Sequence, residues 1–275
     1  MERIGILYNP LSAPAVELGE ELEAWLHRKN LATWRGVSHD ARDDPLPLSS
    51  CSLLICLGGD GTVLRAARLA IPHCIPLLPV GLGHLSFMAE VTPEQLRPAI
   101  KRIVAGDFWI EERTLADAHL QPVEGDGSDY TALNEMLVGR GELARSVVVE
   151  VAIDHVRMTS YHADGVLVST ATGSTAYSLA AGGPVIDPRS QALVLVPVAA
   201  HLTHVPALVL HEDAEITLSL HSRYPALLAV DGQISIPLRT GDVLTVRRSK
   251  RVARFARVSS PQYFYATLTE RLHHD

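Results

Sequence analysis

The first 110 residues alternate short apolar runs with longer amphipathic segments, and this alternation constrains the fold more than any other feature of the sequence. Three apolar runs predict buried strands: residues 4–8, 53–57 and 76–82. Three segments have the spacing of amphipathic helices: residues 12–30, the segment after Thr62, and the segment from Thr92 to Gly106. Thr92 can cap the last helix, and Gln95 can complete a capping box. Strands that alternate with helices in this way predict a mostly parallel sheet covered by helices.

The pattern changes after residue 110. From there to residue 260, short strand-like segments follow one another between turns, and one helix-like stretch interrupts them at residues 175–181. Strands at this spacing predict an all-β, sandwich-like domain. We therefore expect an α/β domain over residues 1–110 and a β-sandwich over residues 111–260. A terminal helix over residues 261–275 is expected to pack back on the first domain.

Composition and charge exclude several classes of protein. Lys and Arg number 24 and Asp and Glu number 31, so the net charge of −7 argues against binding nucleic acid through phosphate contacts. The best apolar run, residues 192–200, is shorter than the roughly 20 residues that a membrane span needs. Three cysteines form no disulfide framework, and Cys51 and Cys56 flank an apolar run, which predicts buried free thiols. We expect a cytoplasmic protein that binds neither nucleic acid nor membrane.

A glycine-rich segment lies between the second apolar run and the helix after it: Gly58, Gly59, Asp60, Gly61 and Thr62. Glycines let the backbone approach a phosphate closely, and a helix N-terminus attracts anions, so these residues predict a phosphate-binding loop. Asp60 would repel a phosphate, and we therefore expect it to accept a proton or to hold a metal. A tight turn that needs Asp-Gly only for its backbone angles explains the same residues.

Two further polar clusters follow. Between Ser169 and Ser178, behind an apolar strand, six residues are Ser or Thr and one is Tyr. Such a density of hydroxyl groups suits sugar hydroxyls and base edges, although a polar turn with a helix cap fits as well. Asn134 and Glu135 lie inside a hydrophobic strand predicted over residues 130–138. An Asn side chain carries both a donor and an acceptor, which matches the edge of an adenine.

Together these clusters resemble the NAD kinase family. That family has a G-G-D-G motif in an N-terminal α/β domain, and an N-E pair and a D-G…T-G-S-T-A-Y-S segment in a β-sandwich domain. The order and spacing fit along nearly the whole chain, including the later Asp231, Gly232 and Gln233. The G-G-D-G motif alone is shared with lipid kinases and phosphofructokinases, whereas T-G-S-T-A-Y-S together with N-E is far more specific.

The resemblance implies ATP-dependent phosphorylation of the 2′-hydroxyl of the adenosine ribose of NAD, which gives NADP. It implies Mg²⁺ or another divalent cation, homodimers or homotetramers with shared sites, and Asp60 as the general base. By the same resemblance, the phosphate loop is Gly58, Gly59, Gly61 and Thr62. The residues implied to bind NAD are Asp60, Gly61, Arg65, Asn134, Glu135, Arg145, His162, Asp164, Thr175, Ala176, Tyr177, Ser178, Leu179, Ala180 and Gln233. No residue is assigned as a dedicated metal ligand.

Several positions depart from the family pattern. His84 and Ser86 stand where the family has Asn and Gly, His162 stands where it commonly has Arg or Lys, and Val205 stands where it has Arg. These departures keep open a non-catalytic regulator that binds NAD(H) or ADP-ribose. A lipid kinase of the G-G-D-G type is the other alternative, and the charge of −7 speaks against its binding to a membrane.

The sequence contains 13 histidines, of which His201 and His204 have the spacing of neighbours on a helix. No third ligand lies near them in the sequence, and a structural zinc site usually has four. We therefore expect a packed, hydrogen-bonded role for His201.

Overall fold

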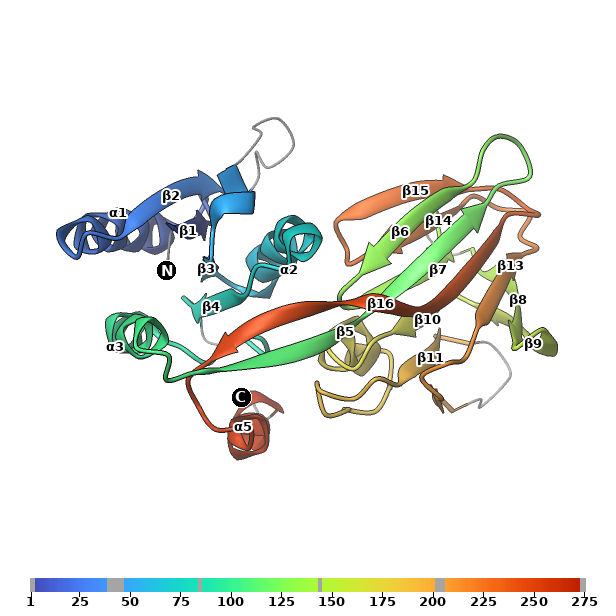
Figure 1. Ribbon diagram of the computed structural model, residues 1–275. Coiled ribbons are helices and arrows are strands. Elements are labelled where there is room, and N and C mark those ends of the chain that lie inside the picture. The colour runs from blue at the N-terminus through green and yellow to red at the C-terminus, as the bar shows by residue number, and fades with distance from the viewer. Residues whose placement is uncertain (1–2, 39–46, 84–85, 143–144, 201–205, 273–275) are drawn as a thin grey trace. The chain divides into compact units, whose positions relative to one another are not determined.

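The computed structural model describes residues 3–38, 47–83, 86–142, 145–200 and 206–272 (Figure 1). The chain divides into two compact units: unit 1 comprises Met1–Glu112 and Ala253–Asp275, and unit 2 comprises Arg113–Val252. Two long strands, β5 (Trp109–Gln121) and β16 (Val243–Arg257), run from one unit into the other. The second domain is predicted to end at residue 260, whereas the chain returns to unit 1 at Ala253. The end of β16 belongs there because Phe255 pairs with Leu77.

Unit 1 contains a parallel sheet, as predicted. Its strands are β2 (Ala32–Val37), β1 (Arg3–Tyr8), β3 (Leu53–Gly58), β4 (Leu77–Gly81) and the end of β16, in that order. All six residues of β3 are buried, which is typical of a strand covered on both faces. The strand β2 is not predicted from the sequence, because the largely half-buried residues of this strand form no apolar run.

Helices pack against this sheet. They are α1 (Ala13–Arg28), α2 (Asp60–Ala70) and α3 (Pro93–Val104). Unit 1 also contains the helix α5 (Tyr263–Leu272) and short 3-10 turns at η1 (Pro47–Ser50) and η2 (Ile71–His73). The capping box of α3 is confirmed, since the Gln95 side chain accepts the Thr92 N–H at 3.1 Å. This helix ends just before Gly106, whose φ of 81° suits only glycine without strain. No helix in the described residues is long and apolar enough to cross a membrane.

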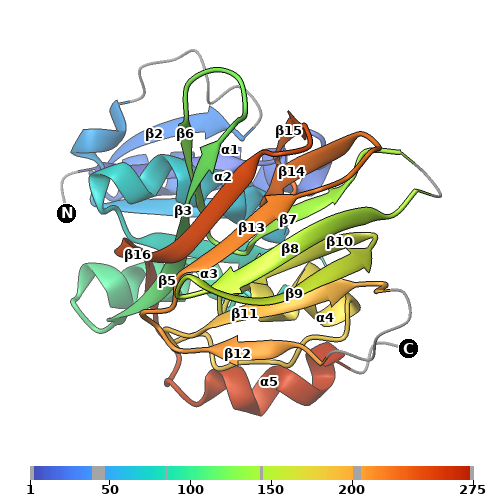
Figure 2. The ribbon, with the colours of Figure 1, turned by 90° about the vertical axis from the view of Figure 1, so that its right-hand side faces the viewer.

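Unit 2 is built from two layers of antiparallel strands, which confirms the predicted sandwich. One sheet has the order β12 (Leu208–Leu210), β11 (Leu193–Val198), β10 (Gly165–Ser169), β7 (Glu135–Arg140), β14 (Ala226–Val230) and β15 (Ile234–Leu238). The other contains β16, β13 (Ile216–Leu220), β8 (Val147–Ile153) and β9 (Val156–Ala163), and β5 joins β6 (Ser128–Ala132) to it (Figure 2). A large apolar core, which includes Val149, Leu218, Val138 and Leu228, takes buried residues from both sheets.

One predicted strand of unit 2 is wrong, and one predicted helix is shorter than expected. The strand predicted over residues 130–138 is two strands, because β6 ends at Ala132 and β7 begins at Glu135. These strands pair in different sheets, β6 with β5 and β7 with β10 and β14. The helix predicted over residues 175–181 is the short turn η3 (Gly173–Thr175) followed by α4 (Tyr177–Ala180). The non-helical backbone of Ala176, with φ of −103° and ψ of −130°, separates them.

The three cysteines are free thiols. Cys51 and Cys56 are buried, as predicted, and Cys74 is exposed. Burial raises the pKa of both buried thiols above the ordinary value, so they stay protonated and unreactive.

Candidate functional site

The glycine-rich loop of unit 1 joins β3 to α2, and Gly59 is the residue before the first turn of the helix. A Cβ atom on Gly58 would lie 2.5 Å from Thr62 Oγ1, so only glycine fits beside this buried side chain. A Cβ atom on Gly59 or Gly61 would meet nothing within 4 Å, and the backbone there borders open space. The loop therefore offers an accessible backbone at the positive end of a helix, which favours an anion.

Asp60 is the first residue of α2, and its carboxylate is bound by the loop that follows β4. Asp60 Oδ1 accepts the Ser86 hydroxyl at 2.5 Å, and Oδ2 accepts the Phe87 N–H at 3.0 Å. The Met88 N–H donates to Oδ1 over a longer 3.4 Å. Ser86 Oγ in turn accepts the Ala89 N–H at 2.8 Å, which directs the hydroxyl proton toward Asp60. These tertiary bonds fix the carboxylate, so Asp60 does more than supply the backbone angles of a turn.

The remaining predicted residue of unit 1 is Arg65, which lies half-buried on α2 one turn beyond Gly61. The structure thus gathers Gly58 to Thr62 and Arg65 on one loop and the helix it opens. Ser86, a departure from the family pattern, binds Asp60 directly. The departure at His84 lies outside the described residues.

The Asn134–Glu135 pair of unit 2 lies at the junction between β6 and β7. The Asp231 carboxylate accepts three successive backbone N–H groups there, from Leu133 at 3.0 Å, Asn134 at 2.7 Å and Glu135 at 3.2 Å. Thr170 binds the carbonyl side of the same segment, since its hydroxyl donates to Leu133 O at 2.6 Å and its N–H to Asn134 O at 2.8 Å. Bonds from both sides turn the chain out of one sheet and into the other, which is why the predicted single strand does not form.

The T-G-S-T turn packs directly on this junction. A Cβ atom on Gly173 would lie 2.2 Å from Asn134 O, so this close approach requires glycine. Ser174 Oγ donates to Ala171 O at 2.7 Å and accepts the Ile186 N–H at 3.0 Å, which fixes the turn. The two motifs that the sequence analysis singles out in unit 2 are therefore in contact.

Several buried polar atoms along these motifs have no hydrogen-bond partner among the described residues: Asn134 Oδ1, Glu135 Oε2, Thr172 Oγ1 and Ser178 Oγ. The exposed fractions of the four residues are 5%, 8%, 3% and 0%, respectively. A buried polar group without a partner costs roughly 1–3 kcal/mol. Such a cluster is therefore typical of a site that a polar ligand completes, such as one with sugar hydroxyls and base edges.

Burial and the nearby negative charge of Asp231 raise the pKa of Glu135 to about 8. The carboxyl group is therefore mainly neutral at pH 7 and can donate a hydrogen bond as well as accept one. Asn134 and Glu135 then present donors and acceptors side by side.

The other residues implied to bind NAD in unit 2 fall into two groups. Thr175 and Ala176 are half-buried, Ser178 is buried and Tyr177 is 44% exposed, all on the η3–α4 segment with Leu179 and Ala180. Gln233 lies in the turn between β14 and β15, two residues after Asp231. Because Asp231 binds residues 133–135 and Thr170 joins them to the T-G-S-T turn, the fold brings these three segments together.

Arg145, His162 and Asp164 form the second group. The Arg145 guanidinium lies 4.8 Å over the ring of Tyr224 on the surface. Asp164, next to β10, forms an ion pair with Arg140 at 3.2 Å. His162 is exposed on β9, in the sheet opposite the one that carries Glu135.

The role of Asp231 is not predicted from the sequence. Of the motif formed by Asp231, Gly232 and Gln233, only Gln233 is predicted to bind NAD. A signal was present, since Asp-Gly between two apolar runs is a strong hairpin signal. Asp231 and Gly232 have φ values of 51° and 62°, and this turn aims the carboxylate at the 133–135 backbone.

No group of three or more His, Cys, Asp or Glu side chains that could hold a metal occurs in the described part of the chain. His201, His204 and Val205 lie outside it, and nothing in the structure bears on the expectations for them.

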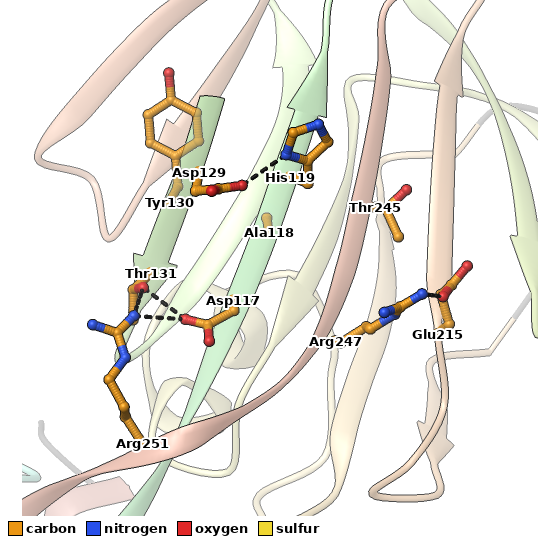
Figure 3. Close-up of a pocket in the computed structure, with 10 residues that line it drawn as sticks. All are labelled: Asp117, Ala118, His119, Asp129, Tyr130, Thr131, Glu215, Thr245, Arg247 and Arg251. Atoms are coloured by element: carbon orange, nitrogen blue, oxygen red, sulfur yellow. Dashed lines mark hydrogen bonds and ion pairs between the residues drawn. The ribbon is translucent and has the colours of Figure 1, made fainter. Parts of the chain in front are cut away.

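Unit 2 also contains a hollow of about 570 Å³ on the face formed by β5, β6, β13 and β16 (Figure 3). Its charged side chains form pairs: Arg251 with Asp117, Arg247 with Glu215 and His119 with Asp129. Since these charges neutralise one another, the hollow has no cationic surface for phosphates. It contains none of the residues implied to bind NAD.

Sequence comparison decides the family. The ATP-NAD kinase N-terminal domain matches residues 33–108, and the ATP-NAD kinase C-terminal domain matches residues 133–258. The chain belongs to the ATP-NAD kinase family. An NAD kinase of Chloroflexus aggregans is 54% identical over 99% of both chains, and one of Dehalococcoides mccartyi is 38% identical over 98% of this chain and 96% of that one.

Solved structures of the family share this fold. The Archaeoglobus fulgidus NAD kinase in complex with ATP is similar with a TM-score of 0.80 and 24% identity, over 98% of each chain. The yeast NADH kinase complexed with NADH has a TM-score of 0.81 and 22% identity, over 99% of this chain and 87% of that one. An α/β unit with a parallel sheet, combined with an antiparallel β unit, is thus the fold of the family.

Proposed function

We propose that this protein is an NAD kinase that transfers a phosphoryl group from ATP to the 2′-hydroxyl of the adenosine ribose of NAD and so forms NADP. ATP-dependent phosphorylation of NAD is the activity of the family, and relatives up to 54% identical over the full chain are NAD kinases. A family member in complex with ATP supports ATP as the phosphoryl donor. NAD as the substrate that accepts the phosphoryl group is supported by one observation in this chain. Asn134, Glu135, Thr172 and Ser178 have buried polar atoms without hydrogen-bond partners among the described residues.

Asn134 and Glu135 are proposed to bind the adenosine of NAD. The side-chain amide of Asn134 offers one acceptor and two donors, as the edge of an adenine requires. The neutral carboxyl of Glu135 can donate to one ribose oxygen and accept from another. Their backbone cannot shift easily, because Asp231 and Thr170 hold it from both sides. Thr175, Ala176, Tyr177, Ser178, Leu179, Ala180 and Gln233 are proposed to line the same nucleotide site.

Asp60 is the proposed general base for the 2′-hydroxyl. A carboxylate oxygen has two lone pairs, so Oδ2, which accepts the Phe87 N–H, can accept one further hydrogen bond. Phosphoryl transfer depends mainly on positioning and on charge stabilisation, and a fixed base contributes about 10²–10⁴ in rate. The action of Asp60 as a base therefore depends on how the 2′-hydroxyl of the bound NAD is positioned.

The glycine-rich loop is proposed to bind phosphate, with Gly58, Gly59, Gly61 and Thr62 at the N-terminus of α2. Mg²⁺ binds through one or two carboxylates together with substrate phosphates in most phosphoryl-transfer sites. An ion carried by the phosphates of ATP therefore fits this chain. Such an ion would neutralise charge on those phosphates.

Arg65, Arg145, His162 and Asp164 are proposed to contact NAD by family resemblance alone. We also propose that the protein forms homodimers or homotetramers and lies in the cytoplasm. Light scattering on the purified full chain would measure the oligomeric state.

The test of the proposed function is NADP formation from NAD, ATP and Mg²⁺, followed through an NADP-specific dehydrogenase. Asp60→Asn removes the base without changing shape, and Asp107→Asn is the matched control, because Asp107 forms an exposed ion pair with Arg102 in the same unit. We expect wild type and the control to form NADP and Asp60→Asn to lose at least about 10²-fold in kcat.

Other outcomes separate the alternatives. Full turnover of Asp60→Asn would remove the base assignment while leaving the kinase. Wild type that binds NAD by calorimetry but forms no NADP would be a non-catalytic regulator. Phosphorylation of diacylglycerol in place of NAD would identify a lipid kinase.

A further inference from the structure

The loop that binds Asp60 is itself bound on its other side by two arginines of the C-terminal segment. Arg271, on α5, donates to Phe87 O at 3.3 Å and to Ala89 O at 3.0 Å. Arg257, at the end of β16, donates to Met88 O at 2.9 Å. Each carbonyl of three consecutive residues therefore accepts from a guanidinium.

The N–H groups of the same three residues point the other way. Phe87 and Met88 donate to the Asp60 carboxylate, and Ala89 donates to the Ser86 oxygen that binds it. Residues 87–89 thus form a hydrogen-bonded bridge with the Asp60 carboxylate on one side and two cations on the other. A charged donor polarises a peptide group and strengthens donation by a neighbouring N–H.

We propose that Arg271 is a positioning residue for the reaction, and that together with Arg257 it fixes residues 86–89 so that their hydroxyl and amide groups orient the Asp60 carboxylate. This inference rests on the proposed function of Asp60. Arg271 touches neither substrate nor reacting atoms in this scheme, and it acts only through the loop.

Two aromatic rings lie beside the Arg271 side chain and restrict it. Its guanidinium lies 5.9 Å from the centre of the Phe87 ring and 5.4 Å from that of Tyr263. No residue of α5 is fully buried, so polar and ring contacts contribute more to its docking than core packing does. Glu90 strengthens the same junction, since its carboxylate accepts the Val258 N–H at 2.6 Å. The C-terminal segment therefore binds the loop beside Asp60 through several hydrogen bonds.

Arg257 is the less useful residue to change. It forms a buried ion pair with Glu111 at 2.7 Å, and the two side chains are only 5% and 7% exposed. Removing Arg257 would break this buried ion pair, and the unit could fail to fold. Arg271 has no acidic partner among the described residues, and Met can replace the apolar part of its side chain.

The experiment compares Arg271→Met, Arg271→Lys and the control Arg254→Met in the full chain. Arg254 is also a C-terminal arginine of unit 1, but it forms a partly exposed pair with Glu112 at 3.4 Å. We expect Arg271→Met to lower kcat by about tenfold, with KM for NAD and for ATP changed less than about twofold. Arg271→Lys should recover part of kcat, and the control should match wild type.

A second pair of variants separates positioning from a general loss of structure. Because Arg271 acts only through Asp60, adding Arg271→Met to Asp60→Asn should lower kcat no further. The same tenfold loss in both backgrounds, or unchanged kcat in Arg271→Met alone, would overturn the proposal. If Asp60→Asn itself keeps full turnover, the proposed function of Asp60 fails instead.

Amide exchange gives a readout that needs no activity. Arg271→Met should speed exchange of the Phe87 and Ala89 amides, while amides of the core strand β3 keep their wild-type rates. Unchanged exchange at Phe87 and Ala89 would show that the arginine does not fix the loop, whatever the enzyme phosphorylates.

Discussion

The Asp231 carboxylate accepts the backbone N–H of Asn134 at 2.7 Å, across 97 positions of the chain. This bond places the hairpin turn between β14 and β15 against the point where β6 gives way to β7. The same carboxylate also binds the N–H groups of Leu133 and Glu135, so three orphan donors at a strand junction share one acceptor group. A charged acceptor suits this task, because hydrogen bonds to charged groups stabilise by about 1.5–3 kcal/mol.

Asp231→Asn should therefore damage both folding and binding of NAD. The amide keeps one acceptor oxygen, but its NH₂ group would oppose the N–H groups that the carboxylate now binds. We expect the free energy of unfolding to fall by about 2–3 kcal/mol and KM for NAD to rise by about tenfold. Asp129→Asn is the control, since its carboxylate is exposed and pairs only with His119 in the described residues. Equal stability of both variants in urea would contradict the role of Asp231.

The Ser86 hydroxyl offers a second test, at the residue where the chain departs from the family pattern. Ser86→Gly restores the family residue and Ser86→Ala removes only the hydroxyl, so both lose the 2.5 Å bond to Asp60. We expect both to lower kcat by about three- to tenfold, because one of the donors that orient the carboxylate is gone. The coupled NADP assay measures this. Ser52→Ala, which removes an exposed hydroxyl in the same unit, is the control. A Ser86→Gly protein faster than wild type would show that the bond restrains Asp60 instead.

The sequence predicted the repetitive parts of the fold. Residues 4–8 and 53–57 are short apolar runs, and the bounds of the strands β1 and β3 agree with them to within one residue. The capping box at Thr92 was also predictable, because all of its partners lie within one turn. Periodicity and local capping are properties of neighbouring residues, so a single sequence contains them.

The errors arose where distant residues decide the outcome. Residues 130–138 look like one strand, and the break at Asn134 depends on a carboxylate almost a hundred residues later. Ser86 reads as a departure from a motif, although its hydroxyl binds Asp60 from 26 positions away. The motifs of the candidate site could be found in the sequence. The distant residues whose hydrogen bonds fix those motifs could not.

Gly173 tests how tightly the two motifs of unit 2 must pack. A Cβ atom there would lie 2.2 Å from the carbonyl oxygen of Asn134, and backbone cannot move aside as a flexible side chain can. Gly173→Ala should lower the free energy of unfolding by about 2–4 kcal/mol and weaken NAD binding. Gly83→Ala is the matched control, since a Cβ atom there meets nothing within 4 Å. Thermal unfolding and calorimetric titration with NAD measure the two effects, and a Gly173→Ala protein that matches the control in both would refute the close contact.

Glu135 makes a prediction about pH, because its pKa is about 8 in the folded protein and near 4.5 in the unfolded chain. Between these values the folded state binds a proton that the unfolded state does not. The contribution of Glu135 to stability is therefore fully present below pH 4.5 and is lost as the pH rises through 8. Above pH 8, folding must keep a charged carboxylate buried beside Asp231.

Glu135→Gln replaces the neutral acid with an amide that cannot ionise. Its free energy of unfolding should stay close to that of wild type at pH 5 and exceed it by a few kcal/mol, to order of magnitude, at pH 8.5. Urea unfolding at a series of pH values measures this difference. Glu142→Gln, at an exposed position of the same unit, is the control for replacing a carboxyl with an amide. If the gap for Glu135→Gln does not grow with pH, Glu135 is ionised in the folded protein at neutral pH, and the hydrogen-bond donor proposed for the ribose is absent.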